Sequence, residues 1–165
     1  MALYRTCLSV AVGLMLVWGG PASAQTGNAP PSAADSSEIQ LVAVKAKADK
    51  PGIYHLTFIA PDSLPNDAVI EMTFPPEFGL EPLEIAGSKD MTGGLRLQKN
   101  NQTVVVQRTG LGDPVPPGKP VTLKLGLIRN PAQLDSSYTV SMVLRNPGKP
   151  SIILEKQVRV RFQVQ

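Results

Sequence analysis

The residues with reactive side chains are few and widely spaced in this sequence. His55 is the only histidine, and it alternates with the apolar residues Tyr54 and Leu56, which places it on the polar side of a predicted strand. A histidine that acts as a general base needs a nucleophile and an orienting carboxylate nearby, and no GxSxG segment or comparable motif supplies them. We therefore predict no catalytic residue and a solvent-facing histidine at position 55.

The sequence also lacks the pattern of a metal or cofactor site. Zinc sites draw on several His or Cys ligands, and Cys7 is the only cysteine. Calcium sites need clustered oxygen ligands, but these carboxylates are scattered, with no Asp-x-Asp-x-Asp pattern: Glu71, Glu77, Glu81, Glu84, Asp90 and Asp113. Residues 110–120 contain Gly and Lys without the spacing of a P-loop. We predict no metal and no cofactor, and calcium between loops stays open as the alternative.

Basic residues alternate outward on the last three strong strand segments, and they are Lys124, Arg145, Arg159 and Arg161. If these strands share a sheet, the four form a basic strip that would bind an envelope protein or an anionic envelope polymer. The interpretation that we favour is a solvated face that discourages aggregation at a sheet edge. The formal net charge of +3, without clustered Lys and Arg, does not indicate nucleic-acid binding.

Strands must position these residues, because apolar residues recur at every second position from Glu38 onward and helical spacing is missing. The clearest segments are 39–43, 54–58, 70–74, 121–127, 138–144 and 158–164, with shorter candidates at 83–86, 95–98 and 103–109. Each has one apolar side to bury. The pattern predicts an all-β fold, an immunoglobulin-like antiparallel β-sandwich of seven to nine strands.

Turn residues separate these segments. Type II turns are predicted where a Pro-Gly pair precedes a strand, at Pro51-Gly52, Pro117-Gly118 and Pro147-Gly148. Asn100-Asn101 predicts a tight hairpin, because asparagine tolerates the left-handed conformation.

Two further details concern strand phase and one long loop. Leu144 and Ile152 should both point inward, and Lys156 would then fall on the inner side, so we predict a β-bulge near residues 155–157. The loop at 75–87 is apolar for a surface connection. We predict that Phe78 and Leu80 close one end of the sandwich, with an exposed contact patch as the alternative.

The first residues predict an export signal. Arg5 is the only charge before Asp35, an apolar run follows at 8–20, and Ala22-Ser23-Ala24 matches a cleavage pattern ahead of Gln25. The run is shorter than the ~20 residues that span a bilayer; an uncleaved anchor is the alternative. We predict a signal peptide at 1–24, a flexible linker at 25–37 and one domain at 38–165, with no transmembrane segment after cleavage. The signal predicts an extracytoplasmic location, periplasmic, secreted or on the cell surface. Exported eukaryotic domains of this size commonly carry disulfides, so the lack of further cysteines favours a bacterial protein.

Three segments resemble a recurrent immunoglobulin-like module of bacterial secreted and surface proteins: residues 54–78, 93–109 and 116–144. They are similar in turn to its ITFPxxF segment, to its hairpin with an NTV-like turn, and to its PxGTxVTLxLxGIxNP and YTVxV segments. The chain is also similar to a family of small cyanobacterial exported proteins of unknown function. The resemblance implies a fold and an extracytoplasmic setting, and it carries over no catalytic residue.

We therefore expect an exported, non-catalytic structural or binding module of the bacterial cell envelope. The alternative is an accessory subunit of an envelope or secretion assembly that pairs with its partner through an edge strand. An unprotected edge strand would favour that alternative. A small hydrolase is the least favoured reading, and a pocket of converging polar groups around His55 would favour it.

Overall fold

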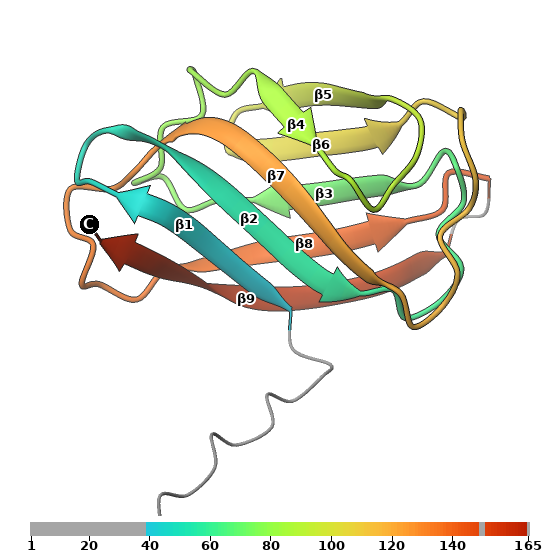
Figure 1. Cartoon of the computed structure of the whole chain (residues 1–165). Coiled ribbons are helices and arrows are strands. Elements are labelled where there is room, and N and C mark those ends of the chain that lie inside the picture. The colour runs from blue at the N-terminus through green and yellow to red at the C-terminus, as the bar shows by residue number, and fades with distance from the viewer. Residues whose placement is uncertain (1–38, 149–150, 165) are drawn as a thin grey trace, which may run out of the picture. The chain divides into compact units, whose positions relative to one another are not determined.

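The computed structural model describes residues 39–148 and 151–164, and these form nine β-strands and no helix (Figure 1). The strands are β1 (Gln40–Ala46), β2 (Pro51–Ile59), β3 (Val69–Thr73), β4 (Ile85–Gly87), β5 (Leu95–Asn100), β6 (Thr103–Arg108), β7 (Pro120–Arg129), β8 (Thr139–Arg145) and β9 (Ile152–Val164). The predicted all-β class is confirmed. The predicted signal peptide at 1–24 and linker at 25–37 lie outside the described residues and stay predictions.

The strands form two layers that share β9. The front sheet has the order β4-β7-β2-β1-β9, and its strands cross in front of those of the back sheet in Figure 1. The back sheet has the order β9-β8-β3-β6-β5. The predicted sandwich is therefore confirmed, with one difference: β1 and β9 are parallel, and Leu41 lies opposite Val160.

The core forms because each central strand turns its apolar side inward. Tyr54, Leu56 and Phe58 of β2 are buried, and so are Ile70 and Met72 of β3 in the opposite sheet. Burying a large apolar side chain stabilises the fold by about 1.5–3 kcal/mol. The sheets are therefore held together mainly by hydrophobic burial.

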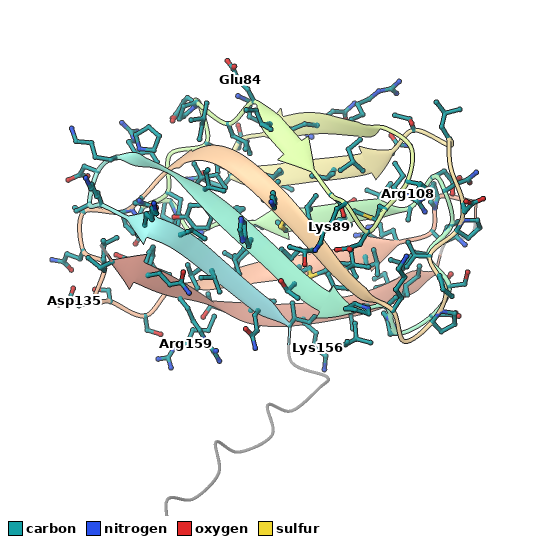
Figure 2. The ribbon with its side chains drawn as sticks, viewed as in Figure 1. Glu84, Lys89, Arg108, Asp135, Lys156 and Arg159 are labelled. Atoms are coloured by element: carbon teal, nitrogen blue, oxygen red, sulfur yellow. The ribbon has the colours of Figure 1, made fainter. Side chains whose placement is uncertain are left out.

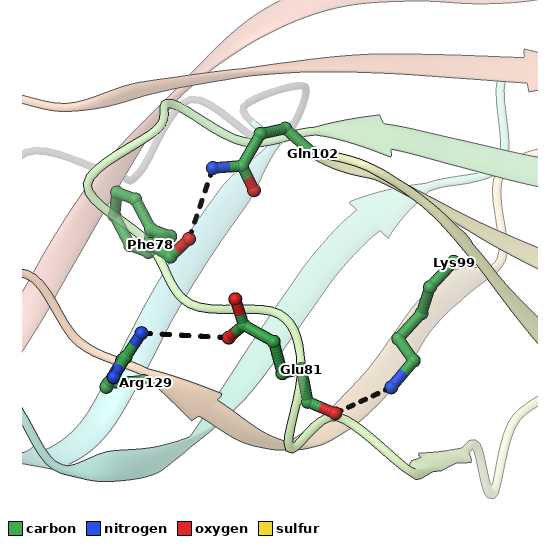
Figure 3. Close-up of polar contacts among 5 residues, drawn as sticks. All are labelled: Phe78, Glu81, Lys99, Gln102 and Arg129. Atoms are coloured by element: carbon green, nitrogen blue, oxygen red, sulfur yellow. Dashed lines mark hydrogen bonds and ion pairs between the residues drawn. The ribbon is translucent and has the colours of Figure 1, made fainter.

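The loop between β3 and β4 closes one end of the sandwich, as predicted. Phe78 and Leu80 are buried, and the Phe78 ring packs edge-on against Tyr138 with 5.3 Å between the ring centres. Figure 3 shows how the loop is held: Gln102 Nε2 donates to the Phe78 carbonyl oxygen (3.3 Å), and Lys99 Nζ donates to the Glu81 carbonyl oxygen (2.7 Å).

A buried arginine organises the loops at the end of β6. The side chain of Arg108 is fully buried, and its guanidinium donates to four backbone carbonyl oxygens, those of Leu64, Pro65, Thr92 and Asp113. Burial lowers the pKa of Arg108, and the nearby charges of Asp67 and Asp113 offset only part of this shift. Arginine keeps its charge in proteins, so four carbonyls share one cation.

Two of the predicted turns are confirmed. Gly118 has a φ of +76°, and Lys119 N donates to the Pro116 carbonyl oxygen, as a type II turn at Pro117-Gly118 requires. Asn101 has a φ of +51° at the hairpin between β5 and β6.

The other two type II turns are wrong. Pro51-Gly52 already belongs to β2, and the left-handed residue of the preceding turn is Asp49, with a φ of +56°. Gly148 does not have the positive φ that a type II turn requires there; its N–H instead donates to the Asn146 side chain.

The predicted bulge near residues 155–157 is also wrong in its position. Leu154 lies opposite Leu144 and Ile152 opposite Arg145, so Ile153 is the extra residue. Because the bulge comes directly after the loop, the phase is restored before Leu154. Lys156 therefore stays in a regular ladder.

Candidate functional site

The structure does not gather the four predicted basic residues into one strip. Lys124 lies in β7 of the front sheet, whereas Arg145 and Arg159 lie at opposite ends of the β8–β9 ladder in the back sheet. Arg145 Nε is 3.2 Å from Glu71 Oε1, and Arg159 Nε donates to Ser137 Oγ at 3.0 Å. The four residues do not form the strip that a shared sheet would give, because β7 and β8 belong to different layers.

Two of the four share a row across the front sheet. Strand register places Lys124 opposite His55, His55 opposite Val42, and Val42 opposite Arg161. Opposite residues in a sheet point to the same face. Gly87 of β4 lies opposite Lys124 and completes the row, so Lys124 and Arg161 are the two cations of one row on the outer face of the front sheet.

His55 lies on this outer face, as its alternation with Tyr54 and Leu56 predicted, and it is half-buried. Desolvation by its neighbours lowers the pKa of the imidazole, and the charge of Lys124 lowers it further. The side chain therefore favours its neutral form. Within residues 39–148 and 151–164, no group of three or more His, Cys, Asp and Glu side chains is arranged to hold a metal ion.

An apolar row lies next to the basic row on the same face. Register places Ile85 of β4 opposite Gly126 of β7, Gly126 opposite Ile53 of β2, and Ile53 opposite Val44 of β1. Ile85 and Ile53 are 60% and 50% exposed, and Val44 is half-buried. A Cβ built on Gly126 would lie 3.3 Å from Ile85 Cβ, so the isoleucine side chain leans over this glycine.

Two bulges add outward residues beside this row. Gly52 of β2 lies opposite Ile128 of β7, but Ile53 lies opposite Gly126, so Leu127 is an extra residue of β7. Leu127 has a φ of +69° and is 40% exposed. In β1 the register shifts near Lys45, which has a φ of +51° and is exposed. A left-handed non-glycine residue costs roughly 1–2 kcal/mol, so the fold holds Leu127 outward at a cost.

We name Val44, Ile53, Ile85 and Leu127 the front patch. The front patch was missed at the level of sequence because Leu127 follows the inward alternation of Leu123 and Leu125. Only the bulge turns it outward. Ile53 did carry a signal, since it alternates with the inward Tyr54 and is therefore an apolar residue on the outer side.

The charged residues on the strands of the front sheet have one sign. The strand segments that build the front sheet are β4, β7, β2, β1 and residues 160–164, and within these described segments Lys and Arg occur but Asp and Glu do not. The cations are Lys45, Lys124, Arg129 and Arg161. The adjoining loop adds two exposed carboxylates: Glu84 directly precedes Ile85, and the Glu81 carboxylate is 3.7 Å from Arg129 Nη2. The outer face of the front sheet is thus apolar and basic.

An open hollow of about 790 Å³ lies at the end of the sandwich that the loop after β3 closes. Its lining includes the carboxylates of Asp49 and Glu77 and the hydroxyls of Ser136 and Ser137. His55 does not line this hollow, so the hollow is not the polar pocket around His55 that would favour a hydrolase.

Comparison with known proteins finds similarity of structure but not of sequence. No protein-family model and no curated protein sequence matches the chain. A cohesin module from a family 33 glycoside hydrolase of Clostridium perfringens is 12% identical with a TM-score of 0.48, and 76% of this chain covers 95% of it. A non-cellulosomal cohesin from Archaeoglobus fulgidus is 10% identical with a TM-score of 0.45, and 77% of this chain covers 92% of it.

The N-terminal domain of a Streptococcus gordonii adhesin is 14% identical with a TM-score of 0.45. The match uses 76% of this chain but only 32% of the adhesin structure, so the chain spans about a third of it. We draw no function from similarities at this level. In the part of the chain that the structure describes, no helix has the length and apolarity needed to cross a bilayer.

Proposed function

We propose that this chain is an exported, non-catalytic binding module of the bacterial cell envelope that contacts a partner protein through the outer face of its front sheet. The observation that carries the proposal is the front patch. Ile53 and Ile85 are each at least half exposed and lie on either side of Gly126 in one cross-strand row. A contiguous exposed apolar patch on a small domain is typical of an interaction surface.

The sheet edges support binding through a face and not through an edge. Among the described residues, no strand pairs with the open side of β9 before Val160. This open stretch carries a bulge at Ile153 and the exposed Lys156 at an inward register position. Bulges and inward-pointing lysines are devices that protect an edge from strand addition.

The outer strand β5 of the back sheet has the same protection. β5 pairs with β6 alone, and Lys99 occupies the register position that follows the inward residues Leu95 and Leu97. Both outer strands of the back sheet therefore carry a lysine where an apolar residue would complete the core. Edge pairing with a partner through β5 or β9, a form of the alternative that the sequence left open, is disfavoured for this reason.

The export part of the proposal rests on sequence. The apolar run at 8–20 and the Ala22-Ser23-Ala24 pattern support a cleaved signal and an extracytoplasmic location.

Affinity capture from an envelope extract tests the proposal. The exported chain and a double variant, Ile53→Ser with Ile85→Ser, would be compared as baits. Leu111→Ser is the matched control, because Leu111 is 67% exposed in a loop outside the front patch. We expect one partner to be retained by the wild type and the control and lost by the double variant. Equal retention by all three baits would overturn the proposal.

A further inference from the structure

We propose that the partner segment that binds the front patch is acidic and amphipathic, with apolar side chains beside Asp and Glu. This inference rests on the proposed function, because it names the chemistry of the partner at the same surface. It is carried by the position of the basic row relative to the apolar row.

The two rows run side by side over the same strands. On β7, β2 and β1 the basic-row and apolar-row residues are two positions apart, as with Lys124 and Gly126, or His55 and Ile53. Two residues along a strand cover about 6.5–7 Å, and three strand spacings cover about 14 Å. A partner segment about 14 Å long therefore meets apolar side chains along one side and cations along the other.

The charges fit an acidic segment specifically. Lys124 and Arg161 are the two cations of the basic row, and Lys45 is exposed in the bulge beside Val44. No carboxylate lies within the strand segments of the front sheet. A basic partner would meet repulsion that nothing on these strands offsets, whereas an acidic partner is attracted before and after contact.

A protein segment fits this surface better than a lipid bilayer does. Side chains that enter a bilayer must project past the polar groups around them. Ile53 and Val44 lie on inner strands of the front sheet, with Lys124 and His55 in the adjacent row. Cations beside apolar residues complement a polypeptide that carries both apolar and acidic side chains.

Leu127 allows binding to be separated from folding. Its left-handed bulge position suits glycine, so Leu127→Gly removes an exposed apolar side chain without straining the backbone. We expect this variant to fold as the wild type does and to bind the partner segment several-fold more weakly.

The experiment uses two synthetic peptides with the same apolar residues, one with Glu and the other with Lys at every polar position. Binding to the exported chain is measured by calorimetry at low and high salt, and the contact surface by amide chemical-shift changes. We expect only the Glu peptide to bind, with shifts on β1, β2 and β7, and with weaker binding at high salt. Lys124→Gln should weaken binding roughly two- to fivefold, and Arg145→Gln on the back sheet should leave it unchanged.

The outcomes distinguish the inference from the proposed function. If the front-patch variants lose their captured partner but the Glu and Lys peptides bind equally, the proposed function stands and the acidic chemistry is overturned. If vesicles containing anionic lipid compete with the Glu peptide at the same residues, the occupant is a lipid surface and the inference is overturned. If neither peptide shifts resonances of the front sheet, the inference is overturned as well, whereas the capture experiment alone decides the proposed function.

Discussion

Lys156 on β9 lies directly opposite Met142 on β8, and yet the methionine is fully buried while the lysine is exposed. Both occupy the inward register of the back sheet, as the buried pair Val140 and Val158 does. The difference arises because β1 pairs with β9 only from Val160 onward, so that among the described residues no strand of the front sheet pairs with β9 at Lys156. Figure 2 shows this side chain at the lower rim of the sandwich.

Removing the charge of Lys156 should leave the open stretch of β9 unprotected against pairing with another chain. In Lys156→Leu the open stretch of β9 gains an apolar inward side, and we expect two chains to associate through it because the protecting charge is gone. Light scattering coupled to size-exclusion chromatography would report a larger mass that increases with concentration. Gln157→Leu is the control, because residue 157 points outward on the same strand. A monomeric Lys156→Leu variant, or equal association of both variants, would contradict this role of Lys156.

The fold class can be predicted from the sequence because the alternation of apolar and polar residues is visible within each strand segment. The segments around Tyr54–Leu56 and Ile70–Met72 are predicted from period two alone, and both become buried strands. Strand pairing is not encoded in this way. The parallel pairing of β1 with β9 joins the two ends of the domain, and it places Arg161 in the front sheet and Arg159 in the back sheet although they are neighbours on one strand face.

The candidate site was not predictable for a related reason. A bulge shifts every later residue to the other face, and its position depends on the partner strand. Leu127 and Ile153 are ordinary strand residues in the sequence, and they become bulge residues only through their pairings with β2 and β8. Leu127 therefore joins the front patch only through tertiary register, whereas Ile53 and Val44 follow the alternation of their own strands.

Leu127→Gly should leave stability unchanged or raise it by up to about 1 kcal/mol. Glycine adopts a φ of +69° without the steric cost that leucine has, and this gain offsets the loss of a side chain that is only partly buried. Urea unfolding followed by circular dichroism would measure the free energy of unfolding. A loss of more than 1 kcal/mol would mean that Leu127 is a core residue and not part of an interaction surface.

His55 should make the domain less stable as the pH falls from 7 through 6. Its pKa is lowered in the folded chain, whereas the unfolded chain keeps a value near 6.5. The unfolded chain therefore takes up a proton first, and the free energy of unfolding decreases as the pH drops through the folded-state pKa. The contribution is complete above about pH 6.5.

Urea unfolding at a series of pH values would measure this dependence, and an NMR titration of the His55 ring would give its pKa directly. His55→Gln should remove the slope in this range. Lys124→Gln should move the ring pKa upward, because the lysine charge is one of the two causes of the shift. A His55 pKa at or above 6.5 in the folded protein is the result that would refute this prediction.

Arg108→Lys should destabilise the domain by about 3 kcal/mol. The guanidinium donates to four carbonyl oxygens in a buried site, and a lysine ammonium has only three donors at a single point. At least one buried carbonyl would lose its partner, and the shorter reach would pull the loops that meet at Arg108 out of place. Arg96→Lys is the matched control, because Arg96 is exposed on the adjacent strand β5 and such a change is usually worth within about 0.5 kcal/mol. Chemical unfolding of both variants measures the difference, and equal stabilities would show that the four carbonyl contacts of Arg108 do not hold these loops.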